Sequence, residues 1–481
     1  MRYKISRFHN LTVFTGSFRE LGKLLGLDRV SKVGYFRKKL KQVLVQERTD
    51  ELHSKLFRSW LGEKPDMFFY IDGHVRIYHG HTANLSKKYV SRQRLCLSGT
   101  TEFWVNDGKG MPLMVITSEL NEKLKEAIEL AIEDIKTEMP LPLDQNTPRF
   151  TMVFDRESYE PKWFKKLWED HRVAVLTYRK NVKDKWEEGL FKETDTQLLN
   201  SNVTMLLCEM GTLLSDVWFR EVRKLSDSGH QTAILTTHPR LPMPQIAERM
   251  FSRWTQENYF KYMMANFDFD KMIEYGSVQI DPHRTLPNPK YKQLTEKLKR
   301  VRAKKLRLEA KVYSKTDYKD GRPMEEQLTK NMKDTVEWIE QIDDLEQKIS
   351  ELIENRSREP SRITVAEMDD EKRYNKLKEE GKKYKNAICM LVYRAETALF
   401  NTISEYFKGA QNNGRMLIKE IFSSDADMIP DHQNNTLTIV LHSMSTPRAN
   451  KAVDKLCRYL NETETIYPYT NMKMVFKSIA V

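Results

Sequence analysis

The stretch MFFYIDGHVRIYHGH, residues 67–81, is the part of the sequence that says most about the fold. Its apolar and aromatic residues follow the period of two that is typical of a β-strand with two distinct faces. Phe69 and Ile71 then lie on one face, and Tyr70 and Asp72 lie on the other. The carboxylate of Asp72 is therefore either a solvated strand end or a group held for chemistry. Its partners must come from other parts of the chain.

The chain has 481 residues, enough for about two to four domains with a substantial core. It contains no apolar run as long as a membrane span, and its N-terminus has no apolar signal region. We therefore expect a cytoplasmic protein that makes no membrane contact. Four cysteines stand far apart without CxxC spacing, which argues against structural zinc and against a disulfide framework. They are Cys96, Cys208, Cys389 and Cys457.

Positive charge is concentrated near the N-terminus. The net charge is +12, and residues 1–60 hold 14 Lys and Arg against 5 Asp and Glu. Residues 17–62 have helical spacing of apolar positions with a break at Gly26, and the second helix carries Arg37, Lys38 and Lys39. A helix, a short turn and a basic helix are the parts of a helix-turn-helix unit. We predict a helical, basic DNA-binding region at 1–62; a helical hairpin with a solvated basic face is the alternative.

From residue 66 to about 285 the sequence predicts an α/β core. Strands are expected at 67–78, 100–106, 112–117, 149–155 and 173–180, and helices at 118–139 and 161–171. The order is β-β-β-α-β-α-β, which favours a mixed sheet. Residues at about 185–237 are again strand-like and fit a small antiparallel sheet inserted into this core. Residues 244–276 then predict one long helix.

The remainder of the chain predicts two further regions. Residues 290–355 contain two runs of apolar positions spaced 4-3-4-3, separated by a turn-like segment, which predicts an antiparallel coiled-coil hairpin. That hairpin can mediate dimerisation or simply pack on its own core. Residues 371–481 predict a mixed α/β region, with a charged helix followed by strand, helix and strand.

The strand at 149–155 ends in a second acidic residue, Asp155. In a mixed sheet with this strand order, the first and fourth strands lie side by side in the middle. Asp72 and Asp155 are therefore expected to be neighbours in space, although they are far apart in the chain.

A third carboxylate, Glu257, lies in the helix predicted at 244–276, on one stripe with Arg253 and Lys261. Three carboxylates on neighbouring elements suit a pair of divalent cations, which prefer hard oxygen ligands. Without cations the three charges would repel one another and raise each other's pKa. The alternative for Glu257 is a surface ion pair with Arg253 or Lys261.

These residues resemble the DDE transposases of bacterial insertion sequences, in the branch whose RNase H-like core has a β-rich insertion. The resemblance covers roughly residues 66–285 and rests on FFYIDGHVRIYHG, TMVFDRESY and RWTQENYFKYM. In that branch a Tyr and an Arg precede the Glu, and a Lys follows it. Here Arg253 and Glu257 keep the spacing, but Met250 and Met264 occupy the Tyr and Lys positions. Lys261 lies on the same helical face as Met264 and could replace the missing lysine.

The resemblance implies an RNase H-like fold and a DNA transposase that uses two Mg²⁺ (or Mn²⁺) ions. It also implies cleavage of double-stranded DNA at the element ends, followed by transfer of the freed 3′-OH to target DNA. A homo-oligomer, as a dimer in the active complex, and a location at the nucleoid are further expectations. A metal-dependent nuclease without mobility, or a DNA-binding protein that has lost catalysis, are the alternatives.

The resemblance also implies roles for single residues. The metal ligands would be Asp72, Asp155 and Glu257. Arg253 and Lys261 would contact phosphates, and the segment with Arg37, Lys38 and Lys39 would bind the terminal repeats. Trp218 could stack on a base flipped out near the cleavage site, with a position in the hydrophobic core as the alternative.

Overall fold

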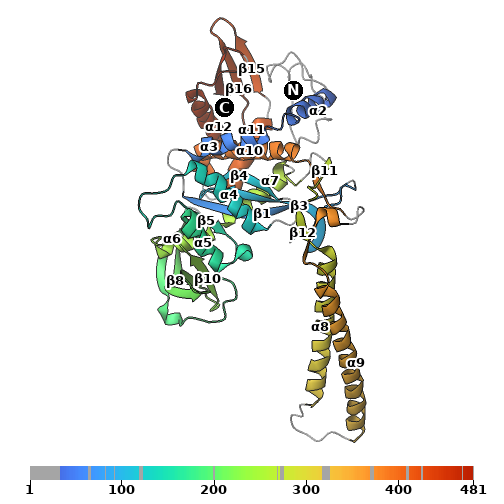
Figure 1. Ribbon diagram of the computed structural model, residues 1–481. Coiled ribbons are helices and arrows are strands. Elements are labelled where there is room, and N and C mark those ends of the chain that lie inside the picture. The colour runs from blue at the N-terminus through green and yellow to red at the C-terminus, as the bar shows by residue number, and fades with distance from the viewer. Residues whose placement is uncertain are drawn as a thin grey trace. The chain divides into compact units, whose positions relative to one another are not determined.

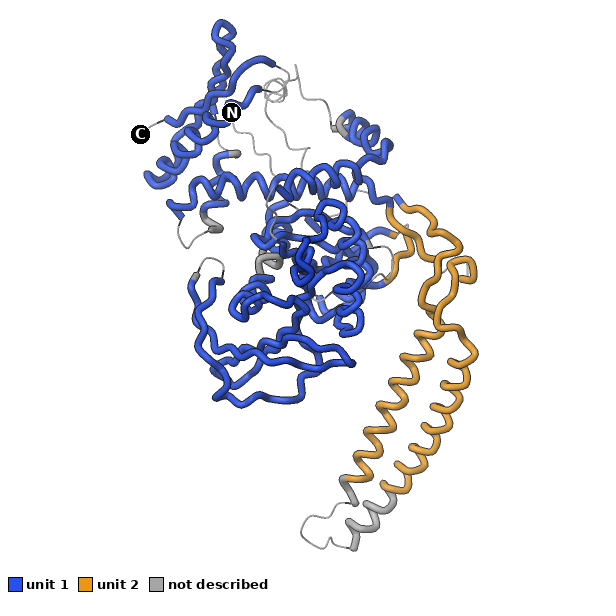
Figure 2. Tube along the Cα trace, turned by 60° about the vertical axis from the view of Figure 1, so that its left-hand side comes forward, with its two compact units in different colours: residues 1–80, 87–276, 378–481 blue, residues 81–86, 277–377 orange. Residues whose placement is uncertain are grey.

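The computed structural model describes residues 33–62, 67–81, 83–90, 93–118, 123–198, 201–267, 269–270, 276–316, 325–368, 373–407, 411–423, 426–467 and 470–479. The chain divides into two compact units, coloured separately in Figure 2. Unit 1 comprises residues 1–80, 87–276 and 378–481, and unit 2 comprises residues 81–86 and 277–377. The described residues form a mixed α/β structure, as the sequence predicts.

A mixed sheet of ten strands lies at the centre of unit 1 (Figure 1). Five strands follow one another across it in the order β4-β3-β1-β5-β6. The pairings β4–β3 and β3–β1 are antiparallel, whereas β1–β5 and β5–β6 are parallel. The short strand β2 pairs with the other end of β3. Their bounds are β1 Phe68–Ile77, β2 Lys87–Val90, β3 Leu95–Asn106, β4 Pro112–Ser118, β5 Phe150–Phe154 and β6 Val173–Tyr178.

The same sheet continues beyond β6 into the predicted insertion. Four antiparallel strands extend it in the order β10-β9-β8-β7, and β10 pairs directly with β6. The strands are antiparallel, as the sequence predicts, and they continue the central sheet through β10. Without β10, the backbone groups of β6 would lie at an open sheet edge, which proteins usually cover. The strands are β7 Lys192–Leu198, β8 Ser201–Leu214, β9 Val217–Leu225 and β10 Gln231–Thr236.

Helices cover both faces of the sheet. Phe69 and Ile71 pack in one hydrophobic cluster with α4 (Leu124–Glu138) and α5 (Pro161–His171). Phe68 and Tyr70 belong to a second cluster with α6 (Met243–Phe251). The alternation predicted for this strand is confirmed, so Asp72 lies on the α6 side.

Two predicted helix boundaries differ from the structure. The helix expected at 244–276 is interrupted: α6 ends at Phe251, and α7 (Trp254–Phe267) begins after a turn at residues 252–253. The helix predicted at 118–139 begins later, because Ser118 is the last residue of β4 and pairs with Thr101. Strand pairing outcompetes helix formation at that position, and α4 begins only at Leu124.

Within the described residues, the flanking parts of unit 1 contribute helices α2 and α3 before the sheet and a smaller layer after it. The three-stranded sheet in the C-terminal part has the order β15-β16-β17, with an antiparallel and then a parallel pairing. Helix α10 packs against the central sheet through Cys389 and Met390, which contact the cluster around Trp104. The bounds are α2 Val33–Leu44, α3 Thr49–Leu61, α10 Glu380–Ile403, α11 Gln411–Ser423, β15 Ala426–Asp431, β16 Thr436–Leu441, α12 Pro447–Glu462 and β17 Lys473–Ser478.

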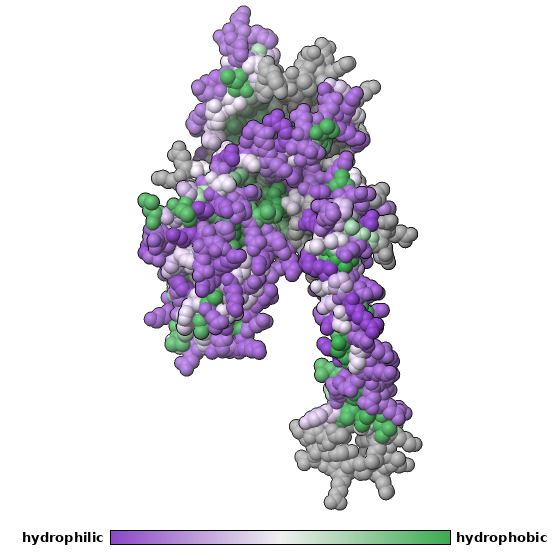
Figure 3. All heavy atoms as spheres, in the orientation of Figure 1, coloured by the Kyte–Doolittle hydropathy of each residue, from purple (hydrophilic) through white to green (hydrophobic). Residues whose placement is uncertain are grey.

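Unit 2 is built around two long helices, α8 (Pro289–Thr316) and α9 (Glu325–Ser357). Leu298, Leu308 and Leu345 are buried between them. Hydrophilic side chains cover most of the face of these helices that is visible in Figure 3. Two short antiparallel strand pairs complete the unit: β11 Ser277–Gln279 with β14 Asn375–Leu377, and β12 Thr285–Pro287 with β13 Arg362–Thr364.

None of the described helices has both the length and the apolar character that a bilayer span requires. The predicted boundaries of the four regions of the chain stay predictions.

Candidate active site

Parallel pairing of β1 and β5 brings Asp72 and Asp155 into the same row of the sheet. Tyr70 pairs with Val153, and each acidic residue follows its strand partner by two positions. Because side chains alternate along a strand, both carboxylates leave the sheet on the face covered by α6. The fold therefore positions the two acids through one local register.

Arg253 lies between the two carboxylates. Its Nη1 is 3.5 Å from Oδ2 of Asp72, and its Nη2 is 3.6 Å from Oδ2 of Asp155. The arginine side chain is 14% exposed, against 27% for Asp72 and 41% for Asp155. One cation thus spans both acids at the end of α6.

The other oxygen of each carboxylate accepts a hydrogen bond from the next backbone N–H. Asp72 Oδ1 accepts from Gly73 at 2.9 Å, and Asp155 Oδ1 accepts from Arg156 at 2.7 Å. The latter bond caps the short 3₁₀ turn Arg156–Ser158. These bonds fix the rotation of both side chains, so that each presents its Oδ2 to the same cation.

The break between α6 and α7 explains how Arg253 reaches this position. The N–H of Ser252 still donates to the carbonyl of Glu248 at 2.8 Å, but the N–H of Arg253 reaches only the carbonyl of Met250, at 3.4 Å. Met250 is fully buried against the sheet and anchors the end of α6. A single continuous helix would not provide this joint.

Glu257 lies four residues further on, in the first part of α7. Its side chain is outside the part of the molecule that the structure describes, so its expected position beside the two aspartates stays a prediction. Among the described residues, no group of three or more His, Cys, Asp or Glu side chains is placed to hold a metal ion. Two of the three predicted ligands are brought together, and the chemistry of this oxygen pair suits a divalent ion such as Mg²⁺ or Mn²⁺.

A family model described as transposase protein matches residues 7–480. The chain belongs to this family of transposase proteins. The identification of a transposase from the sequence motifs is thereby confirmed. No curated protein and no solved structure matches the sequence. Transposases act on DNA.

Tyr178 lies in the same row of the sheet as the acid pair. It was not among the site residues predicted from the sequence of the transposase. Phe154 pairs with Thr177, so Asp155 is level with Tyr178 at the end of β6. The tyrosine ring is 6.5 Å from that of Phe251, the last residue of α6. The signal in the sequence is its position: it ends the apolar strand that follows the one ending at Asp155.

Trp218 is 71% exposed at the tip of the β8–β9 hairpin. The alternative that it belongs to the hydrophobic core is therefore wrong. The strand register makes Arg220 level with Leu176. Trp218 precedes Arg220 by two residues and is level with the beginning of β6, whereas Asp155 is level with its end. Four residues of strand correspond to about 13 Å, so the base-stacking role of Trp218 stays a prediction without support from the register.

Apart from Arg253, the predicted phosphate contacts of the transposase lie on exposed helix surfaces. Lys261 is exposed on α7, and Arg37, Lys38 and Lys39 are exposed on α2. The first helix of the expected helix-turn-helix lies outside the described residues. Exposure leaves these four cations accessible to DNA phosphates, and their contacts remain predictions.

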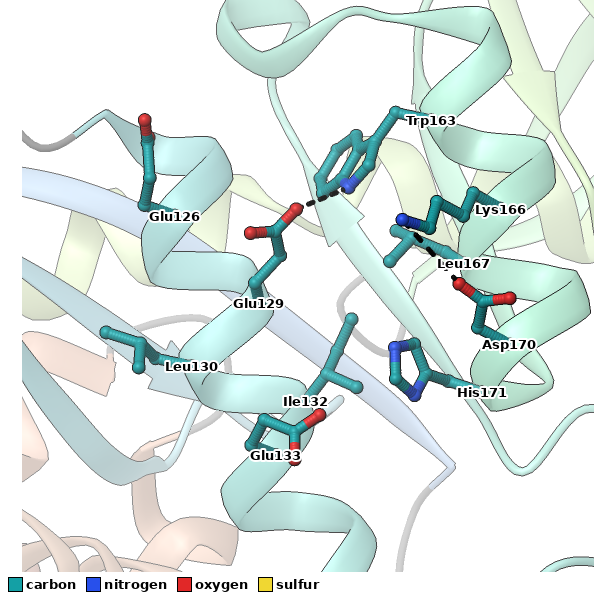
Figure 4. Close-up of a pocket in the computed structure, with 10 residues that line it drawn as sticks. All are labelled: Glu126, Glu129, Leu130, Ile132, Glu133, Trp163, Lys166, Leu167, Asp170 and His171. Carbon is teal, nitrogen blue, oxygen red and sulfur yellow. Dashed lines mark hydrogen bonds and ion pairs between the residues drawn. The ribbon is translucent and has the colours of Figure 1, made fainter.

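A groove of about 510 Å³ lies between α4 and α5 (Figure 4). These helices cover the sheet face opposite to Asp72. Four acidic side chains line the groove together with Lys166 and His171, and Trp163 Nε1 donates to Glu129 Oε1 at 2.9 Å. An excess of carboxylates does not suit a polyanion, so the groove is unsuitable for binding the DNA backbone. The acidic residues are Glu126, Glu129, Glu133 and Asp170.

Proposed function

We propose that this transposase cuts and joins DNA by two-metal-ion chemistry at Asp72, Asp155 and Glu257. The observation that carries the proposal is the common register of the first two acids on neighbouring parallel strands, with both Oδ2 atoms directed to one cation. A carboxylate pair held in this way suits hard divalent ions, Mg²⁺ or Mn²⁺. Glu257, on the helix that follows Arg253, would supply the third ligand.

We further propose that the core is RNase H-like. The strand order β4-β3-β1-β5-β6, with three antiparallel strands followed by two parallel ones, supports this. The acids then lie on the first strand and directly after the fourth strand of that core. The strands β7 to β10 correspond to the β-rich insertion expected between Asp155 and Glu257.

The metal ions, the two aspartates and Arg253 would each have a separate role in the reaction. When bound, two divalent ions supply nucleophile activation and stabilise the charge that develops on the leaving oxygen. Asp72 and Asp155 would hold these ions on the sheet side, and the hydrogen bonds to their Oδ1 atoms keep them oriented. Arg253 would hold a phosphate oxygen of the scissile strand with its planar fork.

The first step would be hydrolysis at the element end. A water oxygen bonds to phosphorus, the bond to the 3′ oxygen breaks, and that oxygen leaves as a 3′-OH after taking up a proton. In the second step the 3′-OH loses its proton as its oxygen bonds to the phosphorus of a target phosphodiester. The bond from that phosphorus to the target's own 3′ oxygen breaks, and this oxygen takes up a proton. Both steps are in-line displacements, so one set of ligands can serve both.

The experiment that tests the proposal is Mg²⁺-dependent nicking and joining of DNA that carries the terminal repeats flanking the gene. Asp72→Asn and Glu257→Gln remove one ligand charge each and are expected to lower the cleavage rate at least about 100-fold. Glu133→Gln is the matched control, because Glu133 is an exposed carboxylate on the opposite sheet face, paired with Lys136. Unchanged cleavage in both site variants would refute the proposal. Nicking by the wild type without joined products would favour a nuclease without mobility.

A further inference from the structure

Arg253 holds the place that a divalent ion would need. Its guanidinium contacts the Oδ2 atoms of both Asp72 and Asp155, which are the oxygens not engaged by the backbone N–H groups of Gly73 and Arg156. The arginine is mostly buried, which strengthens its electrostatic interaction with the acids. A guanidinium and a metal ion cannot occupy the space between these two oxygens at the same time.

We propose that Arg253 is an internal counter-ion of the acid pair. When divalent ions enter the site, its side chain leaves Asp72 and Asp155 and binds a DNA phosphate instead. The inference rests on the proposed function, because it assumes that Asp72 and Asp155 are metal ligands. It adds a coupling between two binding events: metal ions release Arg253 for DNA, and DNA, by holding Arg253, opens the acid pair to metal ions. Such a coupling is reciprocal by thermodynamic necessity.

Electrostatics explains why a counter-ion is needed. Neighbouring strands are about 4.8 Å apart, so two carboxylates in one row repel each other. Arg253 balances this repulsion in the absence of metal. A divalent ion carries twice the charge and approaches carboxylate oxygens to about 2.1 Å, much closer than the arginine contacts at 3.5 and 3.6 Å. The ion is therefore expected to displace the arginine.

The backbone around Arg253 permits the exchange. The residue lies at the joint between α6 and α7, outside the regular helix, and its N–H makes only a 3.4 Å contact with the carbonyl of Met250. Its side chain can therefore turn while Met250 stays anchored in the core. The planar fork of an arginine binds phosphate in two-point contacts, so a released Arg253 has a suitable partner on the DNA backbone.

The test compares DNA affinity with and without metal for the full chain. A labelled duplex of about 30 base pairs is titrated by fluorescence anisotropy in EDTA and in Ca²⁺, with the wild type, Arg253→Gln and Arg240→Gln. Arg240 is the matched control, because it forms an exposed ion pair with Asp144 and its replacement removes the same charge. We expect Arg253→Gln to bind DNA like the wild type in EDTA and about 5- to 10-fold more weakly in Ca²⁺. An equal loss in both conditions, or no loss in either, would overturn the exchange.

A second measurement separates this inference from the proposed function. Binding of Mn²⁺ without DNA is followed by the electron paramagnetic resonance signal of the free ion. Arg253→Gln is expected to bind Mn²⁺ about 5- to 10-fold more tightly than the wild type, and Asp72→Asn to lose the site. If Asp72→Asn binds Mn²⁺ normally, the proposed metal site itself fails. If Asp72→Asn loses the site while Arg253→Gln matches the wild type, only the exchange fails. Thermal unfolding of each variant verifies that it is folded.

Discussion

Asp72 on β1 and Asp155, the residue directly after β5, stand at corresponding positions of two neighbouring parallel strands, and each directs its Oδ2 to the same guanidinium. The convergence follows from strand register alone and does not depend on a flexible loop. An acid pair on a rigid sheet is well suited to precise chemistry, because the packed strands fix the positions of its side chains.

The buried carboxylate of Glu102 is expected to be essential for stability. It is fully buried on β3, 3.0 Å from Arg76 and 3.2 Å from Lys382, and accepts a hydrogen bond from Asn386. Burial opposes its ionisation, but these two cations and the amide lower its pKa to about 2. Glu102→Ala leaves buried cations without a counter-charge and should lower the free energy of unfolding by about 3–5 kcal/mol. Urea denaturation measures this difference, and a change below about 1 kcal/mol would contradict the stabilising role of Glu102.

The same carboxylate gives stability a defined pH dependence. Its pKa in the folded protein lies below the ordinary glutamate value of 4.5, so its contribution to stability is present above pH 4.5 and is lost as the pH falls toward 2. In the variant Glu102→Gln, this part of the loss of stability at acid pH should disappear. An acid titration of unfolding that is equally steep in the variant and the wild type would exclude Glu102 as the source.

His238 is expected to set stability at mildly acidic pH. Burial, and then the charge of Arg220, lower its pKa to about 4, so the ring is neutral in the folded protein at pH 7. Its Nδ1 accepts hydrogen bonds from the N–H groups of Arg240 and Leu241 at 3.2 and 3.0 Å, which a proton on Nδ1 would abolish. The unfolded chain takes up a proton first, so stability is full above pH 6.5 and declines as the pH falls toward 4. His238→Asn keeps a side-chain acceptor, so the melting temperature of this variant should depend less on pH between 6.5 and 4. If the melting temperature fell with pH as steeply as in the wild type, this explanation would be contradicted.

Trp218 offers a test of the expected base stacking. Because its side chain is 71% exposed, Trp218→Ala should change the free energy of unfolding by less than about 0.5 kcal/mol. From the register we expect the rate of Mg²⁺-dependent cleavage to stay within about threefold of the wild type. A 2-aminopurine reporter at the cleavage site measures stacking directly. If Trp218→Ala raised its fluorescence and slowed cleavage, the indole would reach the site after all.

In unit 2, Lys305 occupies a position of the apolar seam between α8 and α9. It pairs with Glu309 and Glu346, and both glutamates are about half exposed. Exposed ion pairs contribute at most about 1 kcal/mol, whereas a leucine at this position would bury apolar surface against the facing helix. Lys305→Leu should therefore slow amide hydrogen exchange in α8 and α9. Faster exchange than in the wild type would show that the ion pairs matter more than the seam.

Much of the arrangement of the acid pair can be predicted from the sequence, because it depends on the local pattern of apolar residues and on the order of the strands. Alternation around Ile71 predicts the two faces of β1, and the order of strands predicts that β1 and β5 are neighbours. The proximity of Asp72 and Asp155 follows from these two local facts. The family resemblance points to the same pair, and the family model confirms that the chain is a transposase.

The parts that the sequence does not predict depend on tertiary contacts. The helical period continues through Ser252 and Arg253, so nothing in the pattern signals the break between α6 and α7. The pairing of β10 with β6 depends on edge protection, which no local window records. The bridge made by Arg253 depends on the first of these features, since the joint between α6 and α7 must form beside the acid row. The bridge could therefore be identified only from the three-dimensional structure.

The most direct measurement is anomalous diffraction from Mn²⁺ in crystals of the full chain bound to DNA with the element ends. We expect a manganese peak within bonding distance of Oδ2 of both Asp72 and Asp155, with Arg253 turned away toward a phosphate. Crystals saturated with Mn²⁺ in which both carboxylates still contact Arg253, and the only manganese peaks lie elsewhere, would contradict it.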